Sequence, residues 1–183
     1  ERFNVQADVV TFGKILGGGF ASGAITFPKE MGKLFTYGES PTLGVKKPRM
    51  IHPGTFNSMA TTMAADLATL DQLTSEAYRH LDRLGARLRE GLKKILSDLG
   101  IRAQVTGLSS IFHIHFTSEE AVNAESADTA DPLFIRVYDL NMLARRVNLA
   151  KAHCSYCSTP MTDADIDQTL EAMKETLTRM LPM

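Results

Sequence analysis

A lysine stands between a short apolar run and a cluster of glycines near the start of the chain. Lys14 and the preceding Gly13 follow the run 9–12, which contains three apolar residues, and three consecutive glycines occupy 17–19. We interpret 9–12 as a short buried strand with Lys14 at its end. Burying an ammonium is costly, a desolvated lysine has a lowered pKa, and the neutral amine is the nucleophile that forms Schiff bases. Because glycine lacks a Cβ, backbone here could lie close against a flat ligand. The pattern therefore predicts a nucleophilic lysine beside a ligand.

Two other interpretations apply to the same stretch. Most lysines are solvated surface charges, and most glycine-rich stretches are turns. A phosphate loop of the G-x-x-x-x-G-K-[ST] type is excluded, because Lys14 precedes the glycines instead of following them. Spacing alone leaves the surface interpretation open.

A second candidate site lies before a predicted helix. The helix is indicated by apolar residues at helical spacing, namely Met59, Met63, Leu67 and Leu70. We expect Gly54 and Thr55 just before its N-terminus, where free N–H groups and the helix dipole favour an anion such as a phosphate. The alternative is ordinary capping of the helix by Asn57 or Ser58.

Histidines and cysteines supply further candidates. His113 and His115 could bind a metal or touch substrate, but histidines at this spacing more often line a solvated or half-buried sheet face. Cys154 and Cys157 form a lone C-x-x-C, which could be redox-active or half of a zinc site. Without a second pair, we interpret them as reduced cysteines in a strand and at its margin.

Bulk composition restricts the class of protein. The chain has 183 residues, 44% hydrophobic and 22% charged, with a net charge of −1. This profile is typical of one or two soluble globular domains and gives no electrostatic case for binding nucleic acid or an anionic membrane. No apolar run reaches the length of a membrane span. Few cysteines and no visible export signal favour a cytoplasmic protein.

The order of elements predicts the architecture. We expect helices at 29–36, 59–70, 75–98, 132–146 and 163–179, and strands at 9–12, 21–27, 101–106, 110–116, 147–149 and 155–158. The helix at 75–98 has a predicted solvated side that includes Arg83, Arg87 and Arg89, and a predicted apolar stripe of Leu81, Leu84, Leu88, Leu92, Ile95 and Leu96. The helix at 132–146 has a predicted apolar stripe of Leu133, Val137, Leu140 and Leu143. Thr162 and Asp165 form a capping box before the last helix. This order suits an α/β part at 1–98, which we take as part of a large domain, joined to a small α+β domain at 99–183.

Three motifs in this order resemble a known family. Residues 8–19, followed by Gly23 and Ala24, resemble the lysine segment of class III aminotransferases of pyridoxal-phosphate fold type I. Residues 52–58 look like the family's phosphate-binding Gly-Thr before an alanine-rich helix, and 159–167 are similar to the start of its C-terminal helix. The resemblance is greatest to glutamate-1-semialdehyde 2,1-aminomutases and to aminotransferases acting on β-amino acids.

The resemblance implies a cofactor and roles for three residues. Lys14 would form a Schiff base with pyridoxal 5′-phosphate and then carry a proton during amino-group transfer. Gly54 and Thr55 would bind the phosphate of the cofactor in the neighbouring subunit of a homodimer with shared sites. The substrate would be a small amino acid or amino-aldehyde. Aminomutase and aminotransferase both remain open. An aminomutase needs a loop that retains its intermediate, and the glycine- and proline-containing loop that we predict at 37–54 is a candidate. Thr-Phe-Asn at 55–57 favours an aminotransferase slightly.

The resemblance also has limits. It covers only the C-terminal half of a family member, so we expect the aspartate that pairs with the pyridine nitrogen to lie upstream of this sequence. We therefore expect that this chain alone does not transaminate. Where relatives carry a substrate-binding arginine, the only cation is Lys151, which is otherwise a solvated loop lysine. The alternative function is a non-catalytic fragment or partner chain that assembles with a complementary half.

Overall fold

The computed structural model describes residues 3–35, 50, 54–127, 129, 131–150 and 154–181. The chain divides into two compact units, unit 1 (Glu1–Thr74) and unit 2 (Ser75–Met183). Each is described by itself below. The domain division that we expect after residue 98 concerns the domains of a family member and stays a prediction. Most of the predicted loop at 37–54, and Lys151, lie outside the described residues.

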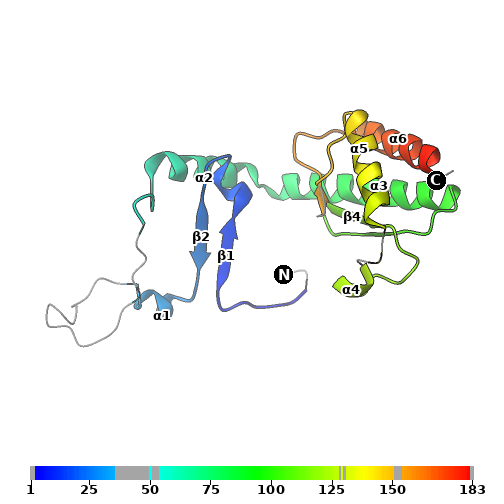
Figure 1. The fold of residues 1–183 in the computed structure, drawn as a ribbon. Helices are drawn as coiled ribbons and strands as arrows, with labels where there is room; N and C mark the ends of the chain where they lie inside the picture. The colour runs from blue at the N-terminus through cyan, green and yellow to red at the C-terminus, as the bar shows by residue number, and fades with distance from the viewer. Residues whose placement is uncertain are drawn as a thin grey trace. The chain divides into compact units, whose positions relative to one another are not determined.

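Unit 1 is a β-hairpin beside one helix (Figure 1). It contains β1 (Val10–Gly13), the short 3₁₀ helix η1 (Lys14–Gly17), β2 (Gly23–Thr26), α1 (Lys29–Gly32) and α2 (Ala60–Gln72). β1 and β2 pair antiparallel, with Val10 opposite Thr26 and Gly13 opposite Gly23. The two predicted strands and the short helix are therefore confirmed, with η1 at the turn between the strands.

The prediction that the first strand is buried is wrong. Every residue of β1 and β2 is exposed, and Phe12 retains 50% of its accessible surface. The exposure has a simple cause, because no third strand pairs with this hairpin among the described residues. A two-stranded hairpin cannot bury both of its faces by itself.

Unit 2 holds the hydrophobic core. It contains α3 (Ser75–Asp98), β3 (Gln104–Thr106), β4 (Ile111–His115), α4 (Ala124–Ala127), α5 (Pro132–Ala144), β5 (Ser155–Tyr156) and α6 (Asp163–Met180). The strands form an antiparallel sheet in the order β3-β4-β5. Figure 1 shows α3, α5 and α6 gathered beside this sheet. The most deeply buried apolar side chains of the core are Leu84, Leu88, Leu92, Met142, Ile166, Met173 and Leu177. Of the described helices, none is both long and apolar enough to cross a membrane.

The helix at 75–98 follows the prediction closely, and α5 does not. The predicted leucine stripe of α3 is buried, including Leu84 and Leu92. On α5 the predicted stripe is wrong at its three leucines, which are exposed, and right at Val137, which packs on the core. Tyr138 and Met142 are the buried residues of this helix. The helix is apolar on most of its sides, so its periodicity does not single out one face. Residues 147–149 form no strand, and the strand expected at 155–158 is reduced to two residues.

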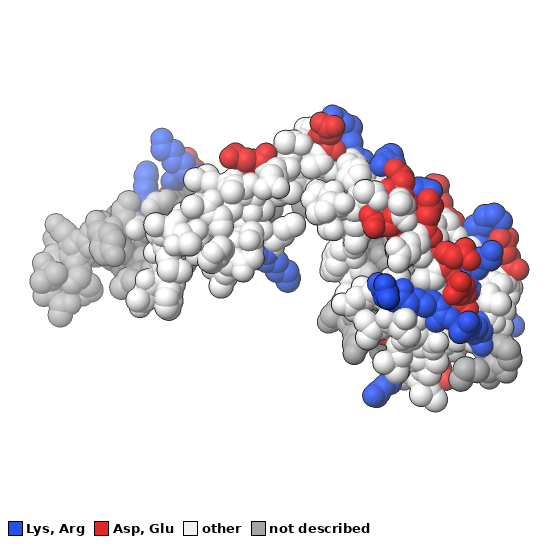
Figure 2. All heavy atoms as spheres, turned by 90° about the horizontal axis from the view of Figure 1, so that it is seen from above, with Lys and Arg blue, Asp and Glu red and all other residues white. Residues whose placement is uncertain are grey.

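Charges of both signs are interspersed over unit 2, whereas unit 1 is mostly uncharged in this view (Figure 2). Arg83 and Arg87 both bind the Asp163 carboxylate, at 2.6 and 2.8 Å. This agrees with the predicted solvated side of the 75–98 helix. Arg89 differs from the prediction, because its guanidinium is half-buried and donates to the carbonyl oxygens of Ser109 and Ile111.

The N-terminus of α6 predicts how stability depends on pH. The Arg83 guanidinium lowers the pKa of Asp163, and the Thr162 backbone N–H lowers the pKa of Asp165. A carboxyl whose pKa falls on folding stabilises the protein above its unfolded-state pKa, and this stabilisation is lost as pH falls through the folded-state pKa. Melting temperature should therefore drop as pH falls below about 4, and the drop should be shallower in Asp163→Asn and Asp165→Asn.

The capping box itself can be tested at neutral pH. The Thr162 side chain accepts from the Asp165 N–H, and the Asp165 carboxylate accepts from the Thr162 N–H at 2.7 Å. Thr162→Ala should lower the free energy of unfolding by about 1 kcal/mol, measured by denaturant titration. Thr178→Ala is the control, since that hydroxyl bonds only within the body of α6. Equal losses in the two variants would contradict a capping role.

Candidate functional site

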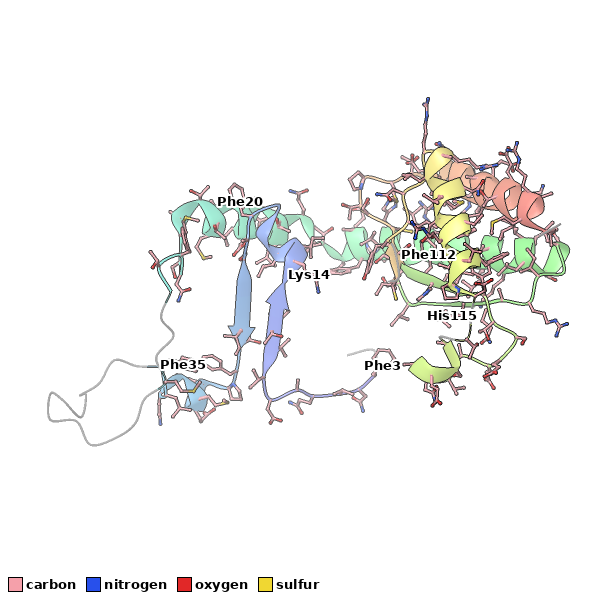
Figure 3. All side chains as sticks on the ribbon, in the orientation of Figure 1. Phe3, Lys14, Phe20, Phe35, Phe112 and His115 are labelled. Carbon is pink, nitrogen blue, oxygen red and sulfur yellow. The ribbon has the colours of Figure 1, made fainter. Side chains whose placement is uncertain are left out.

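Lys14 lies at the point where β1 passes into η1 (Figure 3). Its backbone φ is +55°, a left-handed conformation that is uncommon outside glycine. The side chain is exposed, which corrects the expectation of a desolvated lysine. Within the described part of the chain, the Lys14 amine forms no hydrogen bond and no ion pair. The primary amine is therefore open to a ligand that approaches unit 1.

The glycines after Lys14 have different surroundings. A Cβ on Gly17 would lie 3.0 Å from the Ser22 Cβ, and a Cβ on Gly18 would lie 2.6 Å from the Thr69 Oγ1 on α2. These two glycines thus allow close packing within the protein. A Cβ on Gly19 would meet nothing within 4 Å. Of the triplet, Gly19 is the one whose backbone faces open space.

Gly54 and Thr55 do not lie directly at a helix start, which corrects the prediction. A turn at 55–58 separates them from α2, which begins at Ala60. Capping by Asn57 or Ser58 is also wrong, because Met59 is the N-cap and no side chain caps the helix. Propensity could not distinguish one turn more of helix from an irregular turn at this point. Both Gly54 and Thr55 are exposed.

The structure does not bring Lys14 and Thr55 together within one chain. The η1 turn packs on α2 at Ala65 and Thr69, beyond the first turn of that helix, whereas Thr55 precedes its start. Figure 1 shows these places as different positions along α2. Each residue is available separately on unit 1.

A carboxylate near Lys14 was missed by the sequence prediction. Asp66 is buried on α2 with 9% of its surface exposed, and its Oδ2 accepts a hydrogen bond of 2.8 Å from the Ser22 Oγ. The sequence did contain a signal for it, because Asp66 is an ionisable residue among the alanines of a helix that must pack closely. Periodicity analysis overlooks such a residue because it follows apolar positions only.

The histidines occupy the half-buried sheet face that we expected. His113 and His115 are stacked with ring centres 4.3 Å apart, and the His115 Nε2 lies 2.9 Å from the Thr106 Oγ1. Figure 3 labels His115 beside Phe112 on β4. Both histidines line a cavity of about 660 Å³ between β4 and α5. Among the residues that the structure describes, no three potential metal ligands form a group.

The two cysteines flank β5 as free thiols, as the sequence indicates. Burial raises the pKa of the Cys157 thiol, so little reactive thiolate forms at neutral pH. This environment is typical of a structural cysteine.

Comparison with known proteins gives consistent matches over nearly the whole chain. The family model "Aminotransferase class-III" matches residues 1–177. A glutamate-1-semialdehyde 2,1-aminomutase from Methanothermobacter thermautotrophicus is 36% identical over 179 residues, which cover 97% of this chain and 40% of that protein.

Solved structures give the same result. A β-phenylalanine aminotransferase from Variovorax paradoxus has a TM-score of 0.87 at 28% identity. The match covers 100% of this chain and 41% of the aminotransferase chain. A transaminase with bound pyridoxal phosphate has a TM-score of 0.80 at 25% identity, covering 98% of this chain and 40% of its own. The chain thus spans about 40% of the length of the relatives that it matches.

Proposed function

Because this chain belongs to the class-III aminotransferase family, we propose that it takes part in pyridoxal 5′-phosphate-dependent amino-group transfer through Lys14. The predicted α/β fold class of the fold type I enzymes is confirmed over the matched part of those structures. The proposal rests mainly on Lys14, which directly follows the C-terminal end of β1. Its side chain is exposed and its backbone has a strained, left-handed conformation. Strained residues concentrate at functional sites because the surrounding structure must hold them there.

The residues around Lys14 fit such a cofactor. An aldehyde needs a primary amine that is free to attack it, and Lys14 has no bonding partner among the described residues. The open backbone at Gly19 leaves room beside it. Lys14 would hold the cofactor, which would supply an electron-withdrawing group for the substrate carbon. Once the substrate amine has displaced it, the free Lys14 Nζ would accept a proton from that carbon and return it during the transfer.

We assign Gly54 and Thr55 to the cofactor phosphate in the neighbouring subunit of a homodimer. Both residues are exposed and lie away from Lys14 along α2. This position supports a role in an active site other than the one that contains Lys14 of the same chain. The Thr55 hydroxyl would donate to a phosphate oxygen. Thr55→Ala should therefore raise the cofactor concentration needed for half-saturation, by about tenfold for one lost charge-assisted hydrogen bond.

The substrate is proposed to be a small amino acid or amino-aldehyde. Relatives of both kinds, an aminomutase and an aminotransferase, resemble the chain. The loop at 37–53, which would separate the two chemistries by retaining or releasing an intermediate, lies outside the described residues apart from Met50. A cytoplasmic location is proposed from the low cysteine content.

An absorption spectrum tests the proposed role of Lys14. Pyridoxal phosphate added to the chain should give an absorption band near the edge of the visible range, and Lys14→Ala should remove it. Lys29→Ala is the matched control, because Lys29 is an exposed lysine in the same unit. A band that survives in Lys14→Ala would contradict the role of Lys14. No band with the unaltered chain would favour the alternative of a non-catalytic partner chain.

A further inference from the structure

The turn that follows Lys14 packs against α2. Leu16 and Gly17 are buried in the turn. Gly18 lies against α2, so that a Cβ there would lie 3.3 Å from the Ala65 carbonyl oxygen. At the far end of the turn, the Ser22 Oγ donates to the Asp66 Oδ2 at 2.8 Å. Figure 3 labels Lys14 and Phe20 on this turn, beside α2.

These contacts with α2 can hold the unfavourable backbone conformation of Lys14. A left-handed conformation costs a residue with a Cβ roughly 1–2 kcal/mol. Lys14 has a φ of +55° and its side chain has no bonding partner among the described residues, so the side chain does not offset this cost. Such a conformation persists only where the surroundings fix it. Within unit 1, those surroundings are the contacts between this turn and α2.

Burying the Asp66 carboxylate to make one of these contacts costs folding free energy. The Asp66 Oδ2 is bonded to Ser22, but the Asp66 Oδ1 is buried with no hydrogen-bond partner among the described residues. A buried polar atom without a partner destabilises the folded state, because its hydrogen bonds to water are lost and not replaced. A small apolar residue at this place would pack on the turn without that cost, as Ala65 does. The carboxylate therefore brings something that packing alone does not, namely a directional bond to Ser22.

We propose that Asp66 is a positioning residue for Lys14, acting through the Ser22 hydroxyl. The hydrogen bond fixes the C-terminal end of the turn against α2, and Gly18 fixes its middle. The N-terminal end is then held at Lys14, whose exposed side chain is available to a ligand. This role rests on the proposed function, in which the Lys14 amine reacts with pyridoxal phosphate.

The first test measures the order of the turn without any cofactor. Asp66→Ala and Ser22→Ala should each speed amide hydrogen exchange in residues 14–22 by about tenfold or more, because one buried hydrogen bond that holds the turn closed is lost. Asp66→Asn keeps an oxygen acceptor for Ser22 and should restore most of the protection. The double variant should exchange no faster than the single ones, since both act through one bond. Asp71→Ala, an exposed carboxylate on the same helix, is the control.

The second test measures the reactivity of Lys14. The chain is mixed with pyridoxal phosphate, reduced with borohydride and mapped by mass spectrometry. Asp66→Ala should slow labelling of Lys14 by about tenfold while labelling of Lys29 is unchanged, and Asp66→Asn should recover most of the rate. If Asp66 had a purely structural role, Asp66→Ala would change hydrogen exchange throughout unit 1. It would then change the labelling rates of Lys14 and Lys29 alike.

The outcomes separate the two proposals. Unchanged exchange in residues 14–22 of both Asp66→Ala and Ser22→Ala would overturn the positioning role, as would failure of Asp66→Asn to rescue either readout. If the unaltered chain is not labelled at Lys14 in preference to Lys29, the proposed function fails, and with it the second step of this inference. Exchange in α3 should stay constant, because α3 belongs to unit 2 and the substitutions lie in unit 1.

Discussion

In the native protein loaded with pyridoxal phosphate, replacing Lys14 with alanine should abolish amino-group transfer. We expect the rate to fall by at least roughly 10³-fold, because one side chain serves both as nucleophile and as proton carrier. The structure leaves the Lys14 amine exposed and without a partner among the described residues, so no structural bond is lost with it. Folding should therefore be unaffected, which circular dichroism can check.

Lys14→Arg separates chemistry from charge. Arginine keeps the positive charge but stays protonated and forms no Schiff base. It should be as inactive as Lys14→Ala, whereas Lys29→Ala should retain full activity. Activity in Lys14→Arg above one tenth of the unaltered rate would show that Lys14 acts through its charge, and would contradict the proposed chemistry.

Gly85→Ala should destabilise unit 2 severely, by about 3 kcal/mol or more. Gly85 is buried on α3, and a Cβ there would lie only 1.9 Å from the Ser109 carbonyl oxygen. The obstacle is backbone, which cannot rotate away. The same carbonyl accepts a bond from Arg89, so relieving the clash would also break that contact. Helix propensity acts in the opposite direction, since alanine is favoured over glycine by about 0.5–1 kcal/mol in a helix interior. The clash is the larger effect.

Gly91→Ala is the matched control on the same helix. A Cβ at Gly91 would also be crowded, at 2.6 Å from Leu170, but the atom that it meets is the end of a flexible side chain. A rotamer change can relieve this contact, so the loss should be at most about 1 kcal/mol. Denaturant titration of both variants decides the point. Equal stabilities would contradict a close contact between Gly85 and the turn at Ser109.

Local patterns predicted the parts of the fold that local forces determine. The helix at 75–98 has a leucine stripe and is followed by a turn in which Gly100 has a φ of +65°. The capping box at Thr162 is visible as a four-residue pattern and forms as predicted. The hairpin of β3 and β4 is likewise a contact between neighbours in sequence. In each case the interaction partners lie a few residues apart, so the sequence contains the whole signal.

The features that were missed depend on distant residues. The exposure of β1 depends on which other elements cover it, and nothing in residues 9–12 encodes that. The true buried face of α5, at Tyr138 and Met142, is selected by α6 and the sheet from a helix that is apolar on most sides. The Ser22–Asp66 bond joins residues 44 positions apart. Lys14 itself was found from its neighbours, whereas its left-handed backbone became evident only in three dimensions.

The measurement that tests the central claim most directly is a map of where pyridoxal phosphate attaches. The unaltered chain is incubated with a slight excess of the cofactor, reduced with borohydride, digested and analysed by mass spectrometry. We expect the label to lie predominantly on the peptide that carries Lys14, at a level well above that of exposed lysines such as Lys29 and Lys94. Equal labelling of all exposed lysines, or labelling that spares Lys14, would contradict the assignment of Lys14 as the attachment point.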